Sequence, residues 1–260
     1  MNPLSNRIAR AAWALALITN AGLAQSAAPR IVIAANAFLA TLDPQQRQSV
    51  LFVFDDDKQR ARWSNLPVRM APRAGLSLAE LSSVQRTAAM ALVSSALSKR
   101  GFEKVQEIME GDEALKTGPR NNPMFGKDLY YVSILGTPSA KQPWMLQFGG
   151  HHLALNLTVA GEQGILTPSL TAAQPALFTL NGKTVRPLGA ESDKAFTLLE
   201  ALDENQRKQA ILNYQVTDLV LGPGKDGKTI QPEGLKASAM KRETARHAAG
   251  CDLGMGGHGP

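Results

Sequence analysis

The sequence predicts an α+β fold in which helices at both ends of a domain pack on a mainly antiparallel sheet. Two strand-like runs, residues 129–135 and 144–159, are joined by a polar segment with glycine and proline, which favours antiparallel pairing. Helical patterns precede and follow these runs. Hydrophobic residues make up 44% of the 260, so the chain can bury a sizeable core.

The first 24 residues have the layout of a secretory signal peptide. Arg7 and Arg10 precede an apolar core at residues 11–18, and small residues stand before a predicted cut after Ala24. Neither this core nor any later stretch reaches the roughly 20 apolar residues that a membrane span needs. We therefore expect an exported protein, periplasmic or extracellular, with no integral membrane span. The alternative is an amphipathic first helix of a cytosolic domain.

Helix signals then recur along the chain. Residues 31–40 are apolar and rich in alanine. Asp43 and Pro44 are a good N-cap and first helical residue for a second helix, which we expect to run into the apolar residues 50–54. Further helical segments are predicted at residues 81–97, at 102–115 and, in one or two pieces, at 193–221.

One short pattern occurs three times, with an apolar residue, a helix N-cap and a glutamine three residues after the cap. This is a capping box with a hydrophobic staple. We interpret it as three ordinary helix starts rather than as duplication. The copies are Leu42-Asp43-x-x-Gln46-Arg47, Leu81-Ser82-x-x-Gln85-Arg86 and Leu202-Asp203-x-x-Gln206-Arg207.

The strand signals centre on residues 144–159, which we predict to form one strand paired with residues 129–135. Asn181-Gly182 lies between two further short runs and is a strong signal for a two-residue hairpin turn.

His151 and His152, two of the four histidines, lie inside the run 144–159. Neutral imidazole is the commonest metal ligand, and histidine is the usual general acid or base. We therefore predict both as catalytic or metal-binding residues, with a divalent transition metal as the candidate cofactor. The alternative is that both are structural and bond to backbone carbonyls at a strand end.

Adjacent residues of a regular strand point to opposite faces, so two neighbouring imidazoles could not bind one ion there. The glycine pair Gly149-Gly150 directly precedes the histidines. We expect a bulge at these glycines that turns both rings to one side.

Four polar or aromatic residues are candidate contacts for a small-molecule ligand. Asn156 follows the histidines on the same strand, and Arg62, Trp63 and Asn65 form a cluster in an irregular segment. The alternative for Trp63 is that it anchors its loop on the core.

Charge and cysteine content exclude some classes of function. The net charge is +6, and removal of Arg7 and Arg10 with the leader lowers it to +4. The remaining basic residues are scattered among acids, so we expect no nucleic-acid partner. Cys251 is the only cysteine, which excludes an intrachain disulfide and a cysteine zinc site.

Three segments resemble a bacterial family catalogued as domain of unknown function 3500. They are Phe-Gly-Gly-His-His-Leu-Ala-Leu-Asn at 148–156, Arg-Trp-Ser-Asn-Leu-Pro at 62–67 and Leu-Val-Leu-Gly-Pro-Gly at 219–224. The resemblance covers about residues 35–240 and implies a fold family without an established activity. It also implies a strand-rich continuation with further histidines beyond Met240. We therefore expect residues 241–260 to be an irregular, non-native tail.

The sequence thus predicts an exported single α+β domain over residues 25–240, C-terminally incomplete, with a site at His151 and His152. Its function is predicted to be that of an enzyme that binds a metal or a small molecule. The alternatives are a non-catalytic envelope protein with structural histidines and a truncated, inactive copy.

Overall fold

The structure is a computed structural model that describes residues 27–119, 121–217, 219–225, 227–241 and 244–245. The leader predicted at 1–24 and most of the tail predicted at 241–260 lie outside the described residues. Among the helices of this described part, none is long and apolar enough to cross a membrane.

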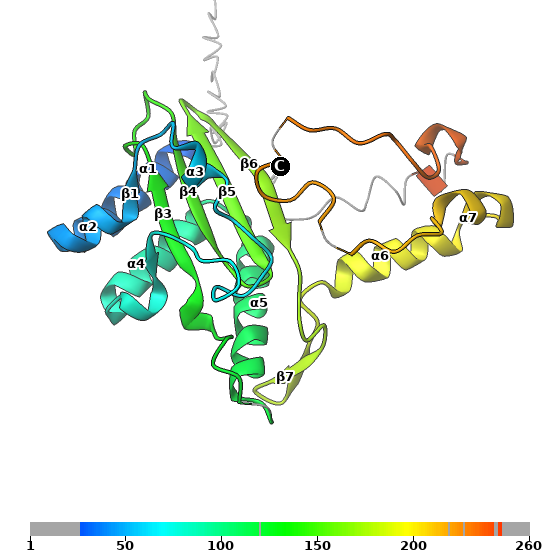
Figure 1. Ribbon diagram of the computed structural model, residues 1–260, viewed down its shortest axis with the longest axis horizontal. Helices are drawn as coiled ribbons and strands as arrows, with labels where there is room; N and C mark the ends of the chain where they lie inside the picture. Colours follow the sequence, from blue (N-terminus) through cyan, green and yellow to red (C-terminus); the bar gives the residue numbers. More distant parts are fainter. Residues whose placement is uncertain (1–26, 120, 218, 226, 242–243, 246–260) are drawn as a thin grey trace, which may run out of the picture.

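A six-stranded sheet forms the centre of the molecule (Figure 1). Its strands are β1 (Leu51–Phe52), β2 (Leu76–Ser77), β3 (Tyr131–Leu135), β4 (Trp144–Gly150), β5 (Leu153–Ala160) and β6 (Gln163–Thr171). The order is β1-β3-β4-β5-β6, with β2 also paired to β3. Every pair is antiparallel except β1 with β3. The predicted α+β class with a mainly antiparallel sheet is confirmed.

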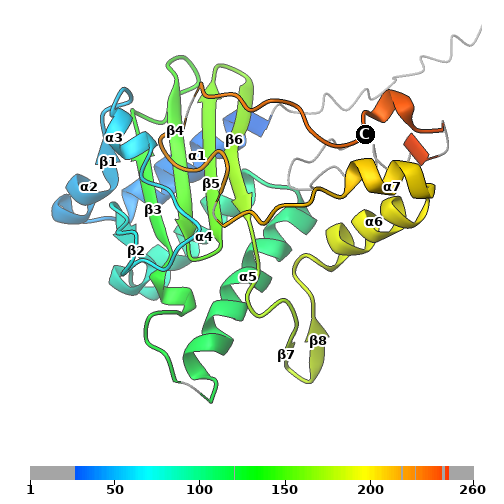
Figure 2. The same cartoon turned by 45° about the vertical axis from the view of Figure 1, so that its right-hand side comes forward.

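Helices cover one face of this sheet and extend beyond its β6 edge. The α-helices are α1 (Ala27–Ala40), α2 (Pro44–Val50), α3 (Asp57–Arg60), α4 (Ser83–Ser95), α5 (Lys99–Thr117), α6 (Gly189–Glu200) and α7 (Glu204–Ala210). The 3₁₀ helices are η1 (Leu78–Glu80), η2 (Lys127–Leu129) and η3 (Ala237–Ala239). Helices α1, α4 and α5 lie behind the sheet in Figure 1, whereas α6 and α7 lie to one side of it in Figures 1 and 2.

The predicted helix starts are confirmed by their hydrogen bonds. Capping boxes open α2 at Asp43, α4 at Ser82 and α7 at Asp203. The prediction that the second helix runs through residues 50–54 is wrong. Helix α2 ends at Val50, and the next two residues form β1 because they pair with β3, which overrides their local helical pattern.

The predicted hairpin at Asn181-Gly182 is also confirmed. It joins β7 (Phe178–Leu180) to β8 (Lys183–Val185), and both turn residues have positive φ, at 50° and 75°. Positive φ at both central residues is the pattern of a type I′ turn. The hairpin packs on α5, where a Cβ on Gly111 would lie 3.4 Å from the Phe178 ring.

The two faces of the sheet differ in polarity. Alternate residues of β5, from Leu153 to Val159, join the apolar core beneath the helices. On the opposite face Ser133, Gln147 and Asn156 form a row across β3, β4 and β5. The segment from α3 to β2 covers this row (Figure 1).

The prediction of one strand over residues 144–159 is wrong. The chain turns back at His151 and His152, so this run forms two antiparallel strands, β4 and β5, with Gly150 paired to Leu153. Both strands are buried along most of their length, and their apolar residues continue up to the turn on each side.

Candidate metal centre

His151 and His152 are the two central residues of the turn between β4 and β5. His152 has a φ of 61°, and positive φ at the second central residue is the pattern of a type II turn. The β4–β5 register is continuous through Gly149 and Gly150, so the predicted glycine bulge is wrong. The turn itself brings the rings together, with centroids 3.6 Å apart and planes inclined by 30°.

Gly150 has a different role, which is to make room for a neighbouring aromatic ring. A Cβ at this position would lie 2.8 Å from the Leu129 carbonyl oxygen and 3.0 Å from Cγ of Tyr130. The absence of a side chain therefore lets Tyr130 pass directly against the strand that leads into the histidine turn.

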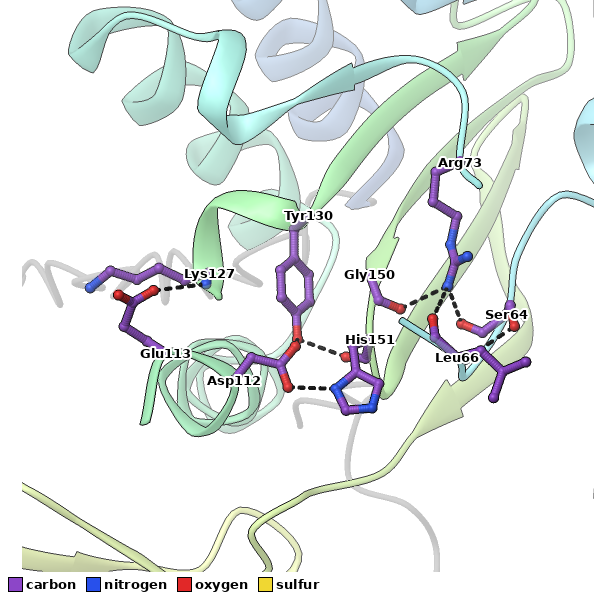
Figure 3. A network of polar contacts seen from close by, with 9 residues as sticks. All are labelled: Ser64, Leu66, Arg73, Asp112, Glu113, Lys127, Tyr130, Gly150 and His151. Atoms are coloured by element: carbon purple, nitrogen blue, oxygen red, sulfur yellow. Dashed lines mark hydrogen bonds and ion pairs between the residues drawn. The ribbon is translucent and has the colours of Figure 1, made fainter. Parts of the chain in front are cut away.

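Asp112 of α5 is the third member of the site and was missed in the sequence. Its carboxylate lies 2.8 Å from His151 Nδ1, and the two residues are only 1% and 6% exposed (Figure 3). The sequence does contain a pattern that places Asp112 in the core. Val105, Ile108, Met109 and Asp112 follow the i, i+3, i+4, i+7 spacing of a buried helix face, so the carboxylate occupies a core position.

Tyr130 completes the buried network. Its hydroxyl lies 2.9 Å from Asp112 Oδ2 and 2.8 Å from the backbone oxygen of His151, and its hydrogen is shared between these acceptors (Figure 3). Burial, followed by the charge of Asp112, raises the pKa of Tyr130 well above its ordinary value. The phenol therefore stays protonated and acts as a hydrogen-bond donor.

Burial sets the protonation of the other groups. It raises the pKa of Asp112, and hydrogen bonds from His151 and Tyr130 oppose this effect. Burial, with a smaller effect of His151, lowers the pKa of His152 to about 4. His152 is therefore a neutral imidazole at neutral pH, the form that binds metal ions. Among the described residues its buried Nδ1 has no hydrogen-bond partner.

NMR of the metal-free protein tests this protonation state. We expect the His152 ring resonance to titrate with a midpoint near 4. Because the unfolded ring takes up its proton near pH 6.5 and the folded ring near 4, His152 lowers the free energy of unfolding as the pH falls through this interval. In the His152→Asn variant the free energy of unfolding should not show this decrease between pH 6.5 and 4. A titration midpoint of the His152 ring near the ordinary pKa of 6.5 would contradict the prediction.

Asp112, His151 and His152 together offer one carboxylate oxygen and two imidazole nitrogens that lie within 4.8 Å of one another. They come from α5 and from the β4–β5 turn, which the tertiary fold brings together. Among the residues that the structure describes, this is the one group of three or more such side chains close enough to hold a metal ion.

The segment before β2 holds the turn in place. The Arg73 guanidinium donates to the backbone oxygens of Ser64, Leu66 and Gly150 at 2.8, 2.9 and 3.0 Å (Figure 3). The backbone N–H of His152 donates to the Asn65 oxygen at 3.2 Å. Asn65, a predicted ligand contact, therefore meets the site through its backbone.

The other predicted ligand contacts belong to a different set of interactions. Arg62, Trp63 and Asn156 line a cavity of about 20 Å³ on the opposite face of the sheet, room for about one water molecule. The Asn156 side chain accepts from Gln147 at 3.0 Å and donates to the Pro168 oxygen at 2.8 Å. The structure thus groups His151 and His152 with Asp112 and Tyr130, apart from these residues.

Comparisons with known proteins identify a family without an assigned activity. A family model described as "Protein of unknown function (DUF3500)" matches residues 24–249. Neither a curated protein nor a solved structure matches the chain.

Proposed function

The chain belongs to the family described as protein of unknown function DUF3500, whose name gives no activity, and we propose from the site alone that Asp112, His151 and His152 bind a divalent transition-metal ion. The observation that carries the proposal is the buried grouping of one carboxylate and two imidazoles within 4.8 Å. A buried carboxylate and an unpartnered imidazole nitrogen are costly unless a binding partner or function retains them.

The spacing of the donor atoms supports direct coordination. Four-coordinate zinc binds nitrogen and carboxylate oxygen tetrahedrally at about 2.0–2.2 Å, so two of its ligands lie about 3.4 Å apart. The Asp112 carboxylate and His151 Nδ1 are 2.8 Å apart, so the two groups need to separate only slightly for a metal ion to replace the proton between them. His152 Nδ1 is then the third donor, and Tyr130 supports Asp112 from behind.

The donor set also suggests the kind of chemistry. Two histidines and one carboxylate bind catalytic zinc and non-haem iron(II), and both kinds of site keep coordination positions open. An ion held this way would polarise a bound small molecule or activate a water. We propose metal-assisted chemistry on a small molecule, with His151 and His152 as the central residues.

Zinc binding by chelator-treated protein tests the proposal, with isothermal titration calorimetry and elemental analysis as readouts. We expect stoichiometric binding that His152→Asn abolishes without loss of the folded state. Asparagine tolerates positive φ, so the turn backbone is retained in this variant. His247→Asn, which removes an imidazole from the predicted tail, is the matched control and should bind like wild type. Equal binding by wild type and His152→Asn would overturn the proposal.

A second candidate is a purely structural role, in which Asp112, His151 and Tyr130 fasten the β4–β5 turn to α5. The pairing of Asp112 with both His151 and Tyr130 favours it. This role predicts no zinc binding at all. It also predicts that His151→Ala destabilises the fold, because Asp112 loses its buried partner, whereas His152→Asn leaves stability at neutral pH unchanged.

We also propose that the protein is exported, to the periplasm or beyond the cell. The support is the leader pattern of Arg7, Arg10, an apolar core and small residues before the predicted cut. Cell fractionation with mass measurement of the product tests this proposal. We expect a mature chain that begins at Gln25. A cytoplasmic product that retains residues 1–24 would contradict it.

A further inference from the structure

The cavity on the polar face of the sheet has no part in the proposed metal centre. It is the cavity of about 20 Å³ that Arg62, Trp63 and Asn156 line, beneath the segment from α3 to β2. One water molecule needs roughly 10–15 Å³, so the cavity admits a single group of the size of water or slightly larger. None of the three proposed metal ligands lines it.

The strand register explains why there is space at this place. Tyr131 of β3, Gly149 of β4 and Ala154 of β5 lie opposite one another in one row across the sheet. Gly149 has no side chain and Ala154 has a single methyl group, and both line the cavity. The covering segment therefore leaves a space above these two small residues, with Tyr131 at its side.

The two glutamine side chains beside the cavity use both of their amide hydrogens within the protein. Gln59 Nε2 donates to Ser133 Oγ at 3.2 Å and to Gln147 Oε1 at 3.0 Å, and Gln147 Nε2 donates to two further oxygens. In the part of the chain that the structure describes, the Trp63 ring N–H and the Tyr131 hydroxyl have no hydrogen-bond partner. These two groups are therefore available as donors to a ligand.

The charged side chains at the cavity are all cations. Arg62 and Arg73 line it, and no aspartate or glutamate is among its described lining residues. Within the described ranges of the chain, neither arginine forms an ion pair with a carboxylate. The acceptors of the Arg73 guanidinium there are neutral backbone oxygens, which include that of Gly150 at 3.0 Å (Figure 3).

A partly buried cation without a counter-ion is electrostatically unfavourable. Burial lowers the pKa of Arg73 from its ordinary value, and the charges of Tyr131 and Tyr130 oppose this effect. A guanidinium nevertheless stays protonated in proteins, so the positive charge of Arg73 remains. An anion in the cavity would balance this charge and would be attracted by Arg62 as well.

We propose that this cavity binds a monovalent anion, either free chloride or the carboxylate group of a small molecule. Arg62 and Arg73 supply the positive charge, and Trp63 and Tyr131 supply neutral N–H and O–H donors. Guanidinium groups suit a carboxylate because their N–H donors are arranged as a planar fork. The volume of about 20 Å³ is too small for a phosphate group, which sets the class of the ligand.

NMR of the full-length protein, titrated with sodium chloride and separately with sodium acetate, tests the proposal. We expect saturable shifts of the Trp63 indole N–H and the Arg73 Nε–H, whereas the indole N–H of the fully buried Trp144 should not shift. Arg62 is exposed, so Arg62→Gln should keep the fold and weaken binding at least about tenfold. Arg69→Gln is the matched control, because Arg69 is an exposed arginine of the same segment that does not line the cavity.

Two outcomes would overturn the proposal. One is a set of shifts that rises without saturation in both salts, which would indicate screening by ions in solution and a cavity that holds only water. The other is equal affinity in Arg62→Gln and Arg69→Gln, which would show that the cations of the cavity take no part. Saturation by chloride would assign the site to a free monovalent anion, whereas saturation by acetate alone would assign it to the carboxylate of an organic molecule.

Discussion

The Asp112→Asn variant is expected to bind zinc at least about 100-fold more weakly than the wild-type protein, because the loss of a direct ligand costs more than the roughly 10- to 100-fold lost with a residue that only supports a ligand. Asparagine preserves the size of the side chain, accepts from His151 Nδ1 and donates to the Tyr130 oxygen, so the buried network stays satisfied. Only the negative charge is lost. Since burial raises the pKa of Asp112, the folded protein should not become less stable at neutral pH.

Asp193→Asn is the matched control for charge removal, because Asp193 is an exposed carboxylate of α6 paired with Arg186. Its zinc affinity, measured by calorimetry, should equal that of wild type. Equal affinities for the Asp112→Asn variant and this control would show that the carboxylate has no part in metal binding. A large loss of stability in Asp112→Asn would instead support the structural role.

Gly150→Ala is expected to lower the free energy of unfolding by about 1–3 kcal/mol. The new Cβ would lie 2.8 Å from the Leu129 oxygen, closer than packed atoms allow, and 3.0 Å from Cγ of Tyr130, tighter than an ordinary contact. Tyr130 must then shift, and its hydrogen bond to Asp112 weakens. Urea denaturation measures the stability, and calorimetry should show weaker zinc binding in the same variant.

Gly164→Ala is the control for this substitution. Gly164 is also a strand glycine without positive φ, but its added Cβ would meet only Leu157 Cδ1, at an ordinary 3.5 Å. We expect its stability to be unchanged or to rise by up to about 1 kcal/mol. If Gly150→Ala and Gly164→Ala lowered the free energy of unfolding equally, the close approach of Tyr130 to Gly150 would not explain the effect.

The helix caps and the hairpin turn could be predicted from the sequence, because they depend on residues that are close together in the chain. The caps at Asp43, Ser82 and Asp203 and the turn at Asn181-Gly182 lie where the sequence places them. Each depends on side chains within a few residues, so composition and spacing are enough to find them.

The histidine turn could not be found in this way. Its central positions hold no glycine, asparagine or proline, and positive φ is uncommon for histidine. Residues on both sides of the turn are buried on both faces of β4 and β5, including the polar Gln147 and Asn156, so no exposed polar stretch marks the turn. A single long strand and a tight hairpin therefore look the same in the sequence.

The composition of the site also depends on the tertiary fold. Asp112 lies on a helix far along the chain from the histidines, and only the packing of α5 against the β4–β5 turn brings them together. Its placement on a buried helix face is a signal in the sequence, but no local pattern indicates His151 as its partner. Conversely, Asn156 follows the histidines in sequence and yet bonds to Gln147 and Pro168.

Crystals soaked in zinc, with anomalous diffraction collected at the zinc edge, test the central claim most directly. The account predicts a peak enclosed by Asp112, His151 and His152, at about 2.0–2.2 Å from one atom of each. No peak between these three side chains, with the Asp112–His151 hydrogen bond intact at 2.8 Å, would contradict it.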